Sequence, residues 1–271
     1  MEMDLTEAQN SGKSETEKVK RKRIVLKLGS TTLTQGTTKI SRGKLEDLAR
    51  QINTLMSEYE IVIVTSGAIA AAKHYIELHR GNAIAVKQAL AAIGQPVLMR
   101  FYQEVFNDYS LKIGQCLLTY RDFENELSKS NTLDTINTLI ENNYIPVINE
   151  NDTIATDEIK FGDNDKLGAL VAGLLKADLL ILASDIDGIY DGDPRSNLNA
   201  KLIKVVTDVE SLNHLQDGSS VSSLGTGGIK SKLEAARICK SNGVEMWIVN
   251  GGKEEFAVKA LRGQIEFSKV I

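Results

Sequence analysis

The sequence predicts an α/β fold, in which a mainly parallel central sheet lies between two layers of helices as a three-layer αβα sandwich. Two observations support this. Short runs of apolar, often β-branched residues recur along the chain with few polar positions, as expected for strands covered on both faces. Longer segments with helical spacing lie between these runs, and such alternation favours parallel strands joined by right-handed crossovers.

The strands and helices can be placed in chain order. Core strands are expected at residues 24–28, 61–64, 115–119, 145–148, 179–183 and 246–249. Helical patterns lie between them at residues 42–58, 83–108, 131–142, 165–176 and 228–242. The second helix should break near Gly94-Gln95-Pro96, because proline removes a hydrogen bond from a helix interior. The alternating residues 153–161 resemble a hairpin.

Composition and charge narrow the class of protein. A formal net charge of −4 gives no general attraction to phosphate backbones, so nucleic acid is a poor partner. No apolar run reaches the length of a membrane span and the acidic N-terminus lacks a targeting pattern, so we expect a cytoplasmic protein without a membrane partner. We expect a disordered charged tail at residues 1–22 and one folded domain at residues 23–271, with two lobes that divide near residues 175 and 176.

Small and polar residues follow several of the predicted strands. Gly29-Ser30 follows the first strand, Thr65-Ser66-Gly67-Ala68 the second, Asn149-Glu150-Asn151-Asp152 the fourth and Ser184-Asp185 the fifth. The carboxyl ends of parallel strands meet at one edge of a sheet, and ligands of open α/β sheets bind there. The sequence therefore predicts a ligand site at this edge.

Two segments have the chemistry of a phosphate site. Lys27 lies inside an apolar strand, so it needs a counter-charge or a ligand anion unless that strand is an edge strand with the lysine turned outward. Residues 224–232 are rich in glycine and open a helix, so their amides could cradle an oxyanion with Lys232 beside them; a flexible surface loop is the alternative. Neither a Walker A loop nor a GxGxxG turn is present.

Amide and carboxylate side chains gather in a second pair of segments. Residues 149–152 and 162–165 flank the expected hairpin and could bind an ammonium group, although Asn and Asp are also common turn residues. A calcium loop is excluded because the positions that should supply its third and last ligands are Leu167 and Leu174. The cysteines have no metal-ligand spacing, so we expect no metal held by protein side chains alone.

Taken together, these segments resemble the glutamate 5-kinases of the amino acid kinase family. The matching stretches follow in the family's order at residues 25–30, 64–70, 91–96, 146–152, 162–165, 184–195 and 224–232. The resemblance implies the amino acid kinase fold, with an amino-acid lobe to about residue 175 and an ATP lobe from about residue 176. Small departures at Ser184, Ile229 and Ser231 preserve size or a hydroxyl group. We expect a short form without the C-terminal PUA module that many bacterial members carry.

The resemblance also implies roles for single residues. Glutamate would be bound by Ser66, Asp152 and Asn164, with Asn149 and Asp163 nearby. Lys27 and Lys232 would contact the transferring phosphoryl group, and Asp165 would hold both lysines in place. ATP would lie against Lys27, Gly29, Ser184, Asp185, Thr226, Gly227, Gly228, Ile229, Lys230, Ser231 and Lys232. Mg²⁺ would bridge the β- and γ-phosphates with few protein ligands.

The activity that the resemblance implies is phosphorylation of the L-glutamate side-chain carboxylate by ATP, the first step of proline biosynthesis. A carboxylate is ionised at neutral pH, so the reaction needs no general base. The resemblance further suggests a homo-oligomer and functional coupling to glutamyl phosphate reductase. Two alternatives stay open. One is a kinase of the same fold that acts on acetylglutamate, aspartate, carbamate or a nucleoside monophosphate, and the other is a non-catalytic nucleotide-binding regulator.

Overall fold

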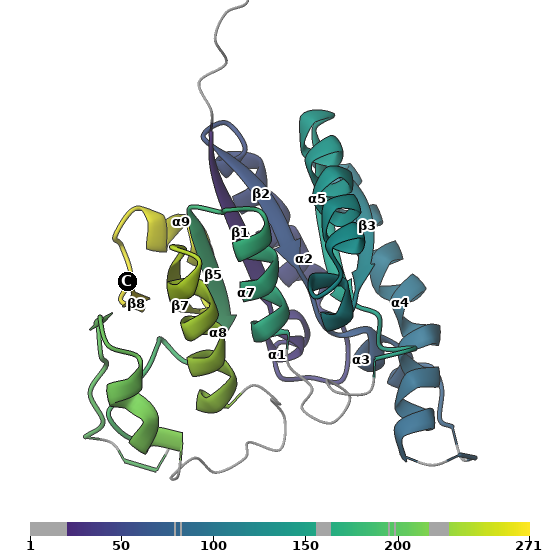
Figure 1. Ribbon diagram of the computed structural model, residues 1–271. Coiled ribbons are helices and arrows are strands. Elements are labelled where there is room, and N and C mark those ends of the chain that lie inside the picture. The colour runs from purple at the N-terminus through teal and green to yellow at the C-terminus, as the bar shows by residue number, and fades with distance from the viewer. Residues whose placement is uncertain are drawn as a thin grey trace, which may run out of the picture.

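The computed structural model describes residues 21–78, 80–81, 83–155, 164–194, 196–197, 199–216 and 228–271. These residues form an eight-stranded sheet in the order β3-β4-β2-β1-β5-β7-β8-β6 (Figure 1). The strands are β1 (Lys22–Leu28), β2 (Tyr59–Val64), β3 (Lys112–Leu118), β4 (Tyr144–Glu150), β5 (Leu179–Ser184), β6 (Val205–Val206), β7 (Glu245–Asn250) and β8 (Ser268–Val270). All pairings in this sheet are parallel except that of β7 with β8, so the predicted fold class is confirmed.

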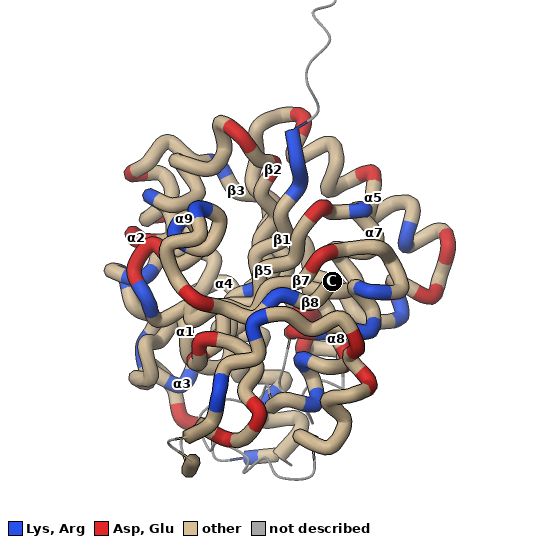
Figure 2. The backbone as a smooth tube through the Cα atoms, turned by 90° about the vertical axis from the view of Figure 1, so that its left-hand side faces the viewer, with Lys and Arg blue, Asp and Glu red and all other residues tan. Residues whose placement is uncertain are grey.

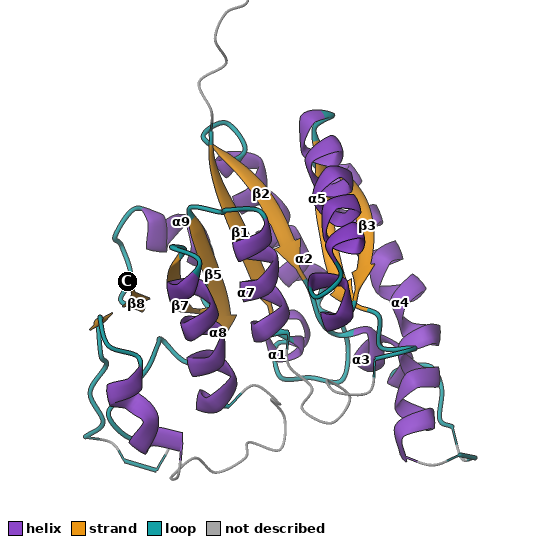
Figure 3. Ribbon diagram, in the orientation of Figure 1, coloured by secondary structure: helices purple, strands orange, loops and turns teal. Residues whose placement is uncertain are grey.

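Helices lie on both faces of the sheet (Figure 3). They are α1 (Ser30–Thr34), α2 (Arg42–Leu55), α3 (Ala68–Lys73), α4 (Ala83–Asp108), α5 (Glu126–Glu141), α7 (Asp165–Leu174), α8 (Ile229–Ser241) and α9 (Phe256–Leu261), with short 3-10 turns η1 (Tyr120–Phe123) and η2 (Glu210–Gln216). Buried side chains of α2, α4 and α9 share one apolar cluster, and those of α5, α7 and α8 share the other. Each face of the sheet therefore has its own helical layer.

The continuous apolar pattern of the strands follows from these two layers. Along β1, Leu26 and Leu28 pack into the cluster of α2 and α4, whereas Val25 packs into the cluster of α7. Successive side chains of a strand point to opposite faces, so a sheet covered on both sides needs apolar residues at odd and even positions alike. The predicted core strands all form. Periodicity missed two short strands, β6 at one edge of the sheet and β8 beside it.

The predicted break in the second helix is wrong, because α4 runs through Pro96 without interruption. Proline costs a helix interior one hydrogen bond, and tertiary packing offsets that loss here. A Cβ atom on Gly94 would lie 1.8 Å from the carbonyl oxygen of Ala68, so α4 and α3 are in direct backbone contact at this point. The glycine that suggested a break instead permits close helix packing.

The two halves of the sheet come from the two halves of the chain. Strands β1 to β4 form one side, β5 to β8 form the other, and they meet where Ile24 to Leu28 pair with Leu179 to Ala183. Most of the expected tail and most of the expected hairpin lie outside the described residues. Lys22, which we had placed in the tail, is the first residue of β1.

Charged residues of both signs are interspersed along the chain. Figure 2 shows lysine and arginine positions mixed with aspartate and glutamate positions on the backbone, which agrees with the small formal net charge of −4. Within the described part of the chain, no helix is both long and apolar enough to cross a bilayer.

Candidate functional site

Three charged side chains from distant parts of the sequence meet inside the protein. Lys27 Nζ lies 2.5 Å from Asp165 Oδ1, and Lys232 Nζ lies 3.1 Å from Asp165 Oδ2. Asp165 is 1% exposed, Lys27 is 5% exposed and Lys232 is 8% exposed. The buried partner that an apolar strand demanded for Lys27 is therefore Asp165, which lies between the two lysines. We call these three residues the Asp165 cluster.

The fold brings the cluster together at the carboxyl edge of the sheet. Lys27 is the last residue but one of β1, Asp165 is the first residue of α7, and Lys232 lies in the first turn of α8. Gly168 of α7 faces β1, and a Cβ atom added there would lie 3.3 Å from the Cβ of Lys27. A larger residue at that helix position would press on the lysine stem, so the glycine makes room for Lys27.

The electrostatics of the cluster keep Asp165 ionised. Burial by itself raises the pKa of this carboxyl, but the charges of Lys232 and Lys27 and their hydrogen bonds to it outweigh burial. The pKa of Asp165 is consequently held below its ordinary value. Two ammonium groups share one carboxylate, so positive charge is in excess among the three side chains, as an anion-binding site requires.

A group of buried amides adjoins the cluster. Asn164 Nδ2 donates to Thr65 O at 2.5 Å and to Asn149 Oδ1 at 2.8 Å. Asn149 Nδ2 donates to Gln95 Oε1 at 2.8 Å, and Thr65 Oγ1 shares a 2.9 Å hydrogen bond with the hydroxyl of Tyr102. Asn164 precedes Asp165 in the chain, so the amide group and the Asp165 cluster share one short stretch of backbone.

Two further predicted residues lie on this side of the site. Ser66, which is half-buried, follows Thr65 at the end of β2. Asp152 lies in the turn after β4, where burial raises the pKa of its carboxyl to about 6. A partly buried carboxylate is poorly solvated when it is ionised, so binding of a cationic ligand beside it would be favourable.

The residues predicted to contact ATP flank the other side of the Asp165 cluster. Gly29 follows β1, and a Cβ atom placed on it would lie 3.8 Å from Lys27 Nζ. Ser184 ends β5 with its hydroxyl 3.3 Å from a carboxylate oxygen of Asp185, and Ser231 Oγ lies 3.4 Å from Asp165 Oδ2. Gly228 caps α8, a 13-residue helix whose first-turn amides are anion donors by their position.

Not every predicted residue joins the site. Lys230 is exposed on α8, and Ile229 packs against the core on the α7 side. Asp163, Thr226 and Gly227 lie outside the described residues. Gln95 and Gly168 were not assigned any role from the sequence. The signal for Gln95 was a polar residue on a helix between two leucines, Leu90 and Leu98, which the structure buries. Its contact with Asn149 could be found only in three dimensions.

The described residues offer no protein cage for a metal ion. Among them, no group of three or more histidine, cysteine, aspartate and glutamate side chains is arranged to hold one. A cation could still fit if phosphate oxygens supplied most of its ligands, since magnesium commonly binds in that way.

Comparisons with known proteins show which family the chain resembles. The amino acid kinase family matches residues 22–250. A glutamate 5-kinase from Shewanella oneidensis is 47% identical over 232 residues, 85% of this chain, and the match spans 62% of that protein's length. A glutamate 5-kinase from Clostridium acetobutylicum is 43% identical over 247 residues, covering 90% of this chain and 91% of that protein.

Solved structures share the fold at much lower identity. UMP kinase from Ureaplasma parvum has a TM-score of 0.65 at 17% identity and covers 93% of this chain and 99% of its own. An isopentenyl phosphate kinase has a TM-score of 0.61 at 16% identity and covers 92% of this chain and 100% of its own. The family match, the close relatives and the shared fold lead to one conclusion: the chain belongs to the amino acid kinase family.

Proposed function

We propose that this protein transfers the γ-phosphoryl group of ATP to the side-chain carboxylate of L-glutamate, forming L-glutamyl 5-phosphate as the first step of proline biosynthesis. The observation that carries the proposal is the Asp165 cluster. Two buried lysines, one on β1 and one on α8, converge on one carboxylate at the carboxyl edge of the sheet. Relatives of 42–47% identity named glutamate 5-kinase support the choice of substrate.

The reaction joins a glutamate carboxylate oxygen to the γ-phosphorus while the bond from that phosphorus to the β-bridging oxygen breaks, and ADP leaves. The attacking carboxylate is already ionised, so no side chain has to remove a proton. Lys27 and Lys232 would neutralise charge on the transferring group, and Asp165 would hold their ammonium groups at a set separation. Mg²⁺ carried on the phosphates would supply further neutralising charge.

Glutamate would bind on the amide side of the cluster. Asp152 would face the ammonium group, and its carboxylate is well suited to this because burial disfavours its charge until a cation arrives. Ser66 and Asn164 would complete the substrate contacts, with Asn149 and Asp163 close by. ATP would lie across Gly29, Ser184 and Asp185 and the start of α8, with its phosphates toward the two lysines.

We further propose that the protein works in the cytoplasm as a homo-oligomer, with its unstable acyl phosphate passed on to glutamyl phosphate reductase. A kinase for another acceptor is the nearest competing function. The carboxylate and amide side chains around Asp152 favour an acceptor with a free ammonium group, which acetylglutamate, carbamate and nucleoside monophosphates lack. The second competing function is that of a regulator without activity. Such a protein would not need two buried lysines, so their presence argues against it.

An acceptor panel tests this function. We expect ADP release with L-glutamate and much less with acetylglutamate, aspartate, carbamate or UMP. Lys27→Ala and Lys232→Ala should each lower turnover about a hundredfold, because a lost transition-state charge contact costs on the order of 3 kcal/mol, with modest effects on glutamate affinity.

Lys240→Ala is the matched control, since Lys240 lies on the same helix as Lys232 but is exposed at the far end. Its turnover should equal that of the unmodified protein. Preference for another acceptor would overturn the substrate, and normal turnover in Lys27→Ala or Lys232→Ala would overturn the roles of these lysines.

A further inference from the structure

Gln95 contacts the candidate site although the sequence analysis assigned it no role. It lies on α4, is 8% exposed, and accepts the hydrogen bond from Asn149 Nδ2 through its Oε1. Asn149 Oδ1 accepts in turn from Asn164 Nδ2. Three side-chain amides from α4, β4 and the residue before α7 thus form one buried chain of hydrogen bonds, which we call the amide relay.

Two backbone groups determine which way the amides of the relay point. Thr65 O can only accept, so Asn164 must turn its Nδ2 toward it. Glu150 N can only donate, and it lies 2.9 Å from Asn149 Oδ1, so Asn149 must turn its oxygen to that side. The Nδ2 of Asn149 then faces Gln95, where an oxygen has to receive it. The polarity of the relay therefore follows from two backbone atoms, the oxygen of Thr65 and the nitrogen of Glu150.

With this polarity, the side chain of Asn164 can offer a ligand only its oxygen, Oδ1. The two hydrogens of its Nδ2 are taken by Thr65 O and Asn149 Oδ1. Its Oδ1 makes no hydrogen bond within the described chain. An acceptor oxygen beside the Asp165 cluster suits an ammonium group and disfavours a carboxylate.

The other end of the relay shows what the glutamine contributes. Gln95 Nε2 is buried and has no hydrogen-bond partner among the described residues. A buried donor without an acceptor is unfavourable, and methionine would fill a similar space without that cost. The property that sets glutamine apart from methionine here is its acceptor oxygen, which is used by Asn149.

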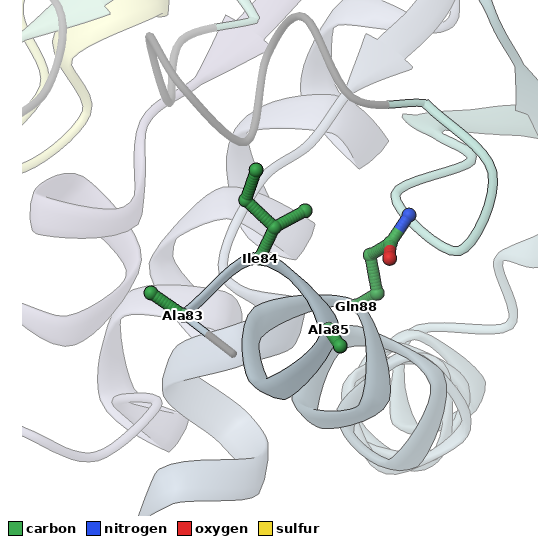
Figure 4. A pocket seen from close by; sticks show the side chains of 4 residues that line it. All are labelled: Ala83, Ile84, Ala85 and Gln88. Atoms are coloured by element: carbon green, nitrogen blue, oxygen red, sulfur yellow. The ribbon is translucent and has the colours of Figure 1, made fainter. Parts of the chain in front are cut away.

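The same face of α4 also holds the loop that carries Asp152. Gln88, seven positions before Gln95 on the helix, donates through Nε2 to Thr153 O at 3.2 Å. Gln88 also lines a pocket together with Ala83, Ile84 and Ala85, whose side chains are drawn in Figure 4. One helix face therefore contacts both segments that are proposed to meet the substrate.

We propose that Gln95 is a positioning residue that determines substrate specificity. The backbone groups set the direction of the amides, and Gln95 holds Asn149 in place: by accepting its hydrogen bond, Gln95 keeps Asn149 Oδ1 where it receives Asn164 Nδ2. The oxygen of Asn164 is then left for the ligand, so that the site selects an acceptor molecule bearing an ammonium group. Gln95 itself does not touch the substrate. The inference rests on the proposed function in one respect, namely that the ammonium group is that of L-glutamate.

The test compares L-glutamate with glutarate, which is the same molecule without the ammonium group. In Gln95→Met the preference for glutamate over glutarate, measured as the ratio of kcat/KM values, should fall about tenfold, because one oriented hydrogen bond is lost. The KM for ATP should change little. Gln95→Glu retains an acceptor oxygen and should retain most of the preference. Gln103→Met, an exposed change on the same helix, is the control.

A purely structural role for Gln95 predicts a different result. The values of kcat/KM for glutamate and glutarate would then fall by the same factor in Gln95→Met, and this would overturn the proposal, as would an unchanged preference. The side-chain amide signals of Asn149 and Asn164 in NMR spectra give a second readout that needs no turnover. They should shift in Gln95→Met and stay in place in Gln95→Glu and Gln103→Met. Absence of glutamate turnover in the unmodified protein would refute the proposed function, while the NMR comparison would still decide whether the relay exists.

Discussion

Replacing Asp165 with asparagine removes the negative charge between two buried lysines while preserving the shape of the side chain. One oxygen remains to accept from a lysine, but the new Nδ2 places a donor where the other lysine also donates. Lys27 and Lys232 are only 5% and 8% exposed, so water can relieve little of the loss. Breaking a buried ion pair by removing one partner costs about 3–5 kcal/mol.

That cost is a large part of the total stability of a domain, which is about 5–15 kcal/mol. We therefore expect the Asp165→Asn variant to unfold at clearly lower urea concentration at pH 7, with a thermal midpoint lower by roughly 10 °C. Asp108→Asn is the control, because Asp108 forms a surface ion pair with Arg42 and should contribute less than about 1 kcal/mol. Turnover should fall at least about a hundredfold in Asp165→Asn, since both lysines lose their fixed position.

The pH dependence provides a separate check. The folded pKa of Asp165 lies below its unfolded value near 3.9, so its stabilising contribution is fully present above pH 4 and is lost as pH falls through the folded pKa. The acid limb of the stability curve should therefore be less steep in the variant. A loss of under about 1 kcal/mol with an unchanged acid limb would falsify the view that Asp165 holds two buried charges.

Three other predictions follow from single contacts. Burial raises the pKa of Asp152 to about 6, so the KM for glutamate should rise as pH falls below 6 and the carboxylate becomes protonated. This rise should vanish in Asp152→Asn. If the pH profile of KM were the same in the variant, Asp152 would not belong to the ammonium site. Gly94→Ala should cost roughly 3 kcal/mol or more in urea unfolding, because its Cβ would overlap a backbone oxygen of α3, whereas Gly43→Ala in α2 meets open space and should be neutral or stabilising by up to about 1 kcal/mol. Gly168→Ala should lower turnover several-fold by pressing on Lys27 while unfolding within about 1 kcal/mol of the parent protein, and unaltered turnover would show that the lysine stem can yield.

Sequence patterns located most of the fold and the edge of the sheet at which the candidate site lies. Core strands and the longer helices were predicted because their periodicity extends over many residues, whereas α1, α3, α9, β6 and β8 are too short to show a period. The uninterrupted course of α4 could not be predicted, since α4 packs through Gly94 against α3, a contact between separate helices that no local pattern reveals. Local rules describe what proline removes but not what a neighbouring helix restores.

The candidate site residues also divide into those that the sequence pattern indicates and those that only the structure reveals. A lysine in an apolar strand indicates that a charged partner is needed, because the cost of burying a charge does not depend on the fold. Which group satisfies Lys27 depends on where the start of α7 lies relative to β1. The family resemblance pointed to Asp165, and the structure places its carboxylate between both lysines. Gln95 remained without a role for a related reason, because its partner Asn149 is 54 positions away.

The sequence by itself thus determined the α/β class, the core strands, the polar residues at their carboxyl ends and the need for a counter-charge near Lys27. Each of these depends on periodicity, on turn chemistry or on the cost of an isolated buried charge, and all three act within a few residues. The tertiary structure alone decided which strands are neighbours, how one carboxylate reaches both lysines and which way the amides of Asn149 and Asn164 point. These features arise from contacts between segments far apart in the chain, where hydrogen-bond direction and close packing select one arrangement.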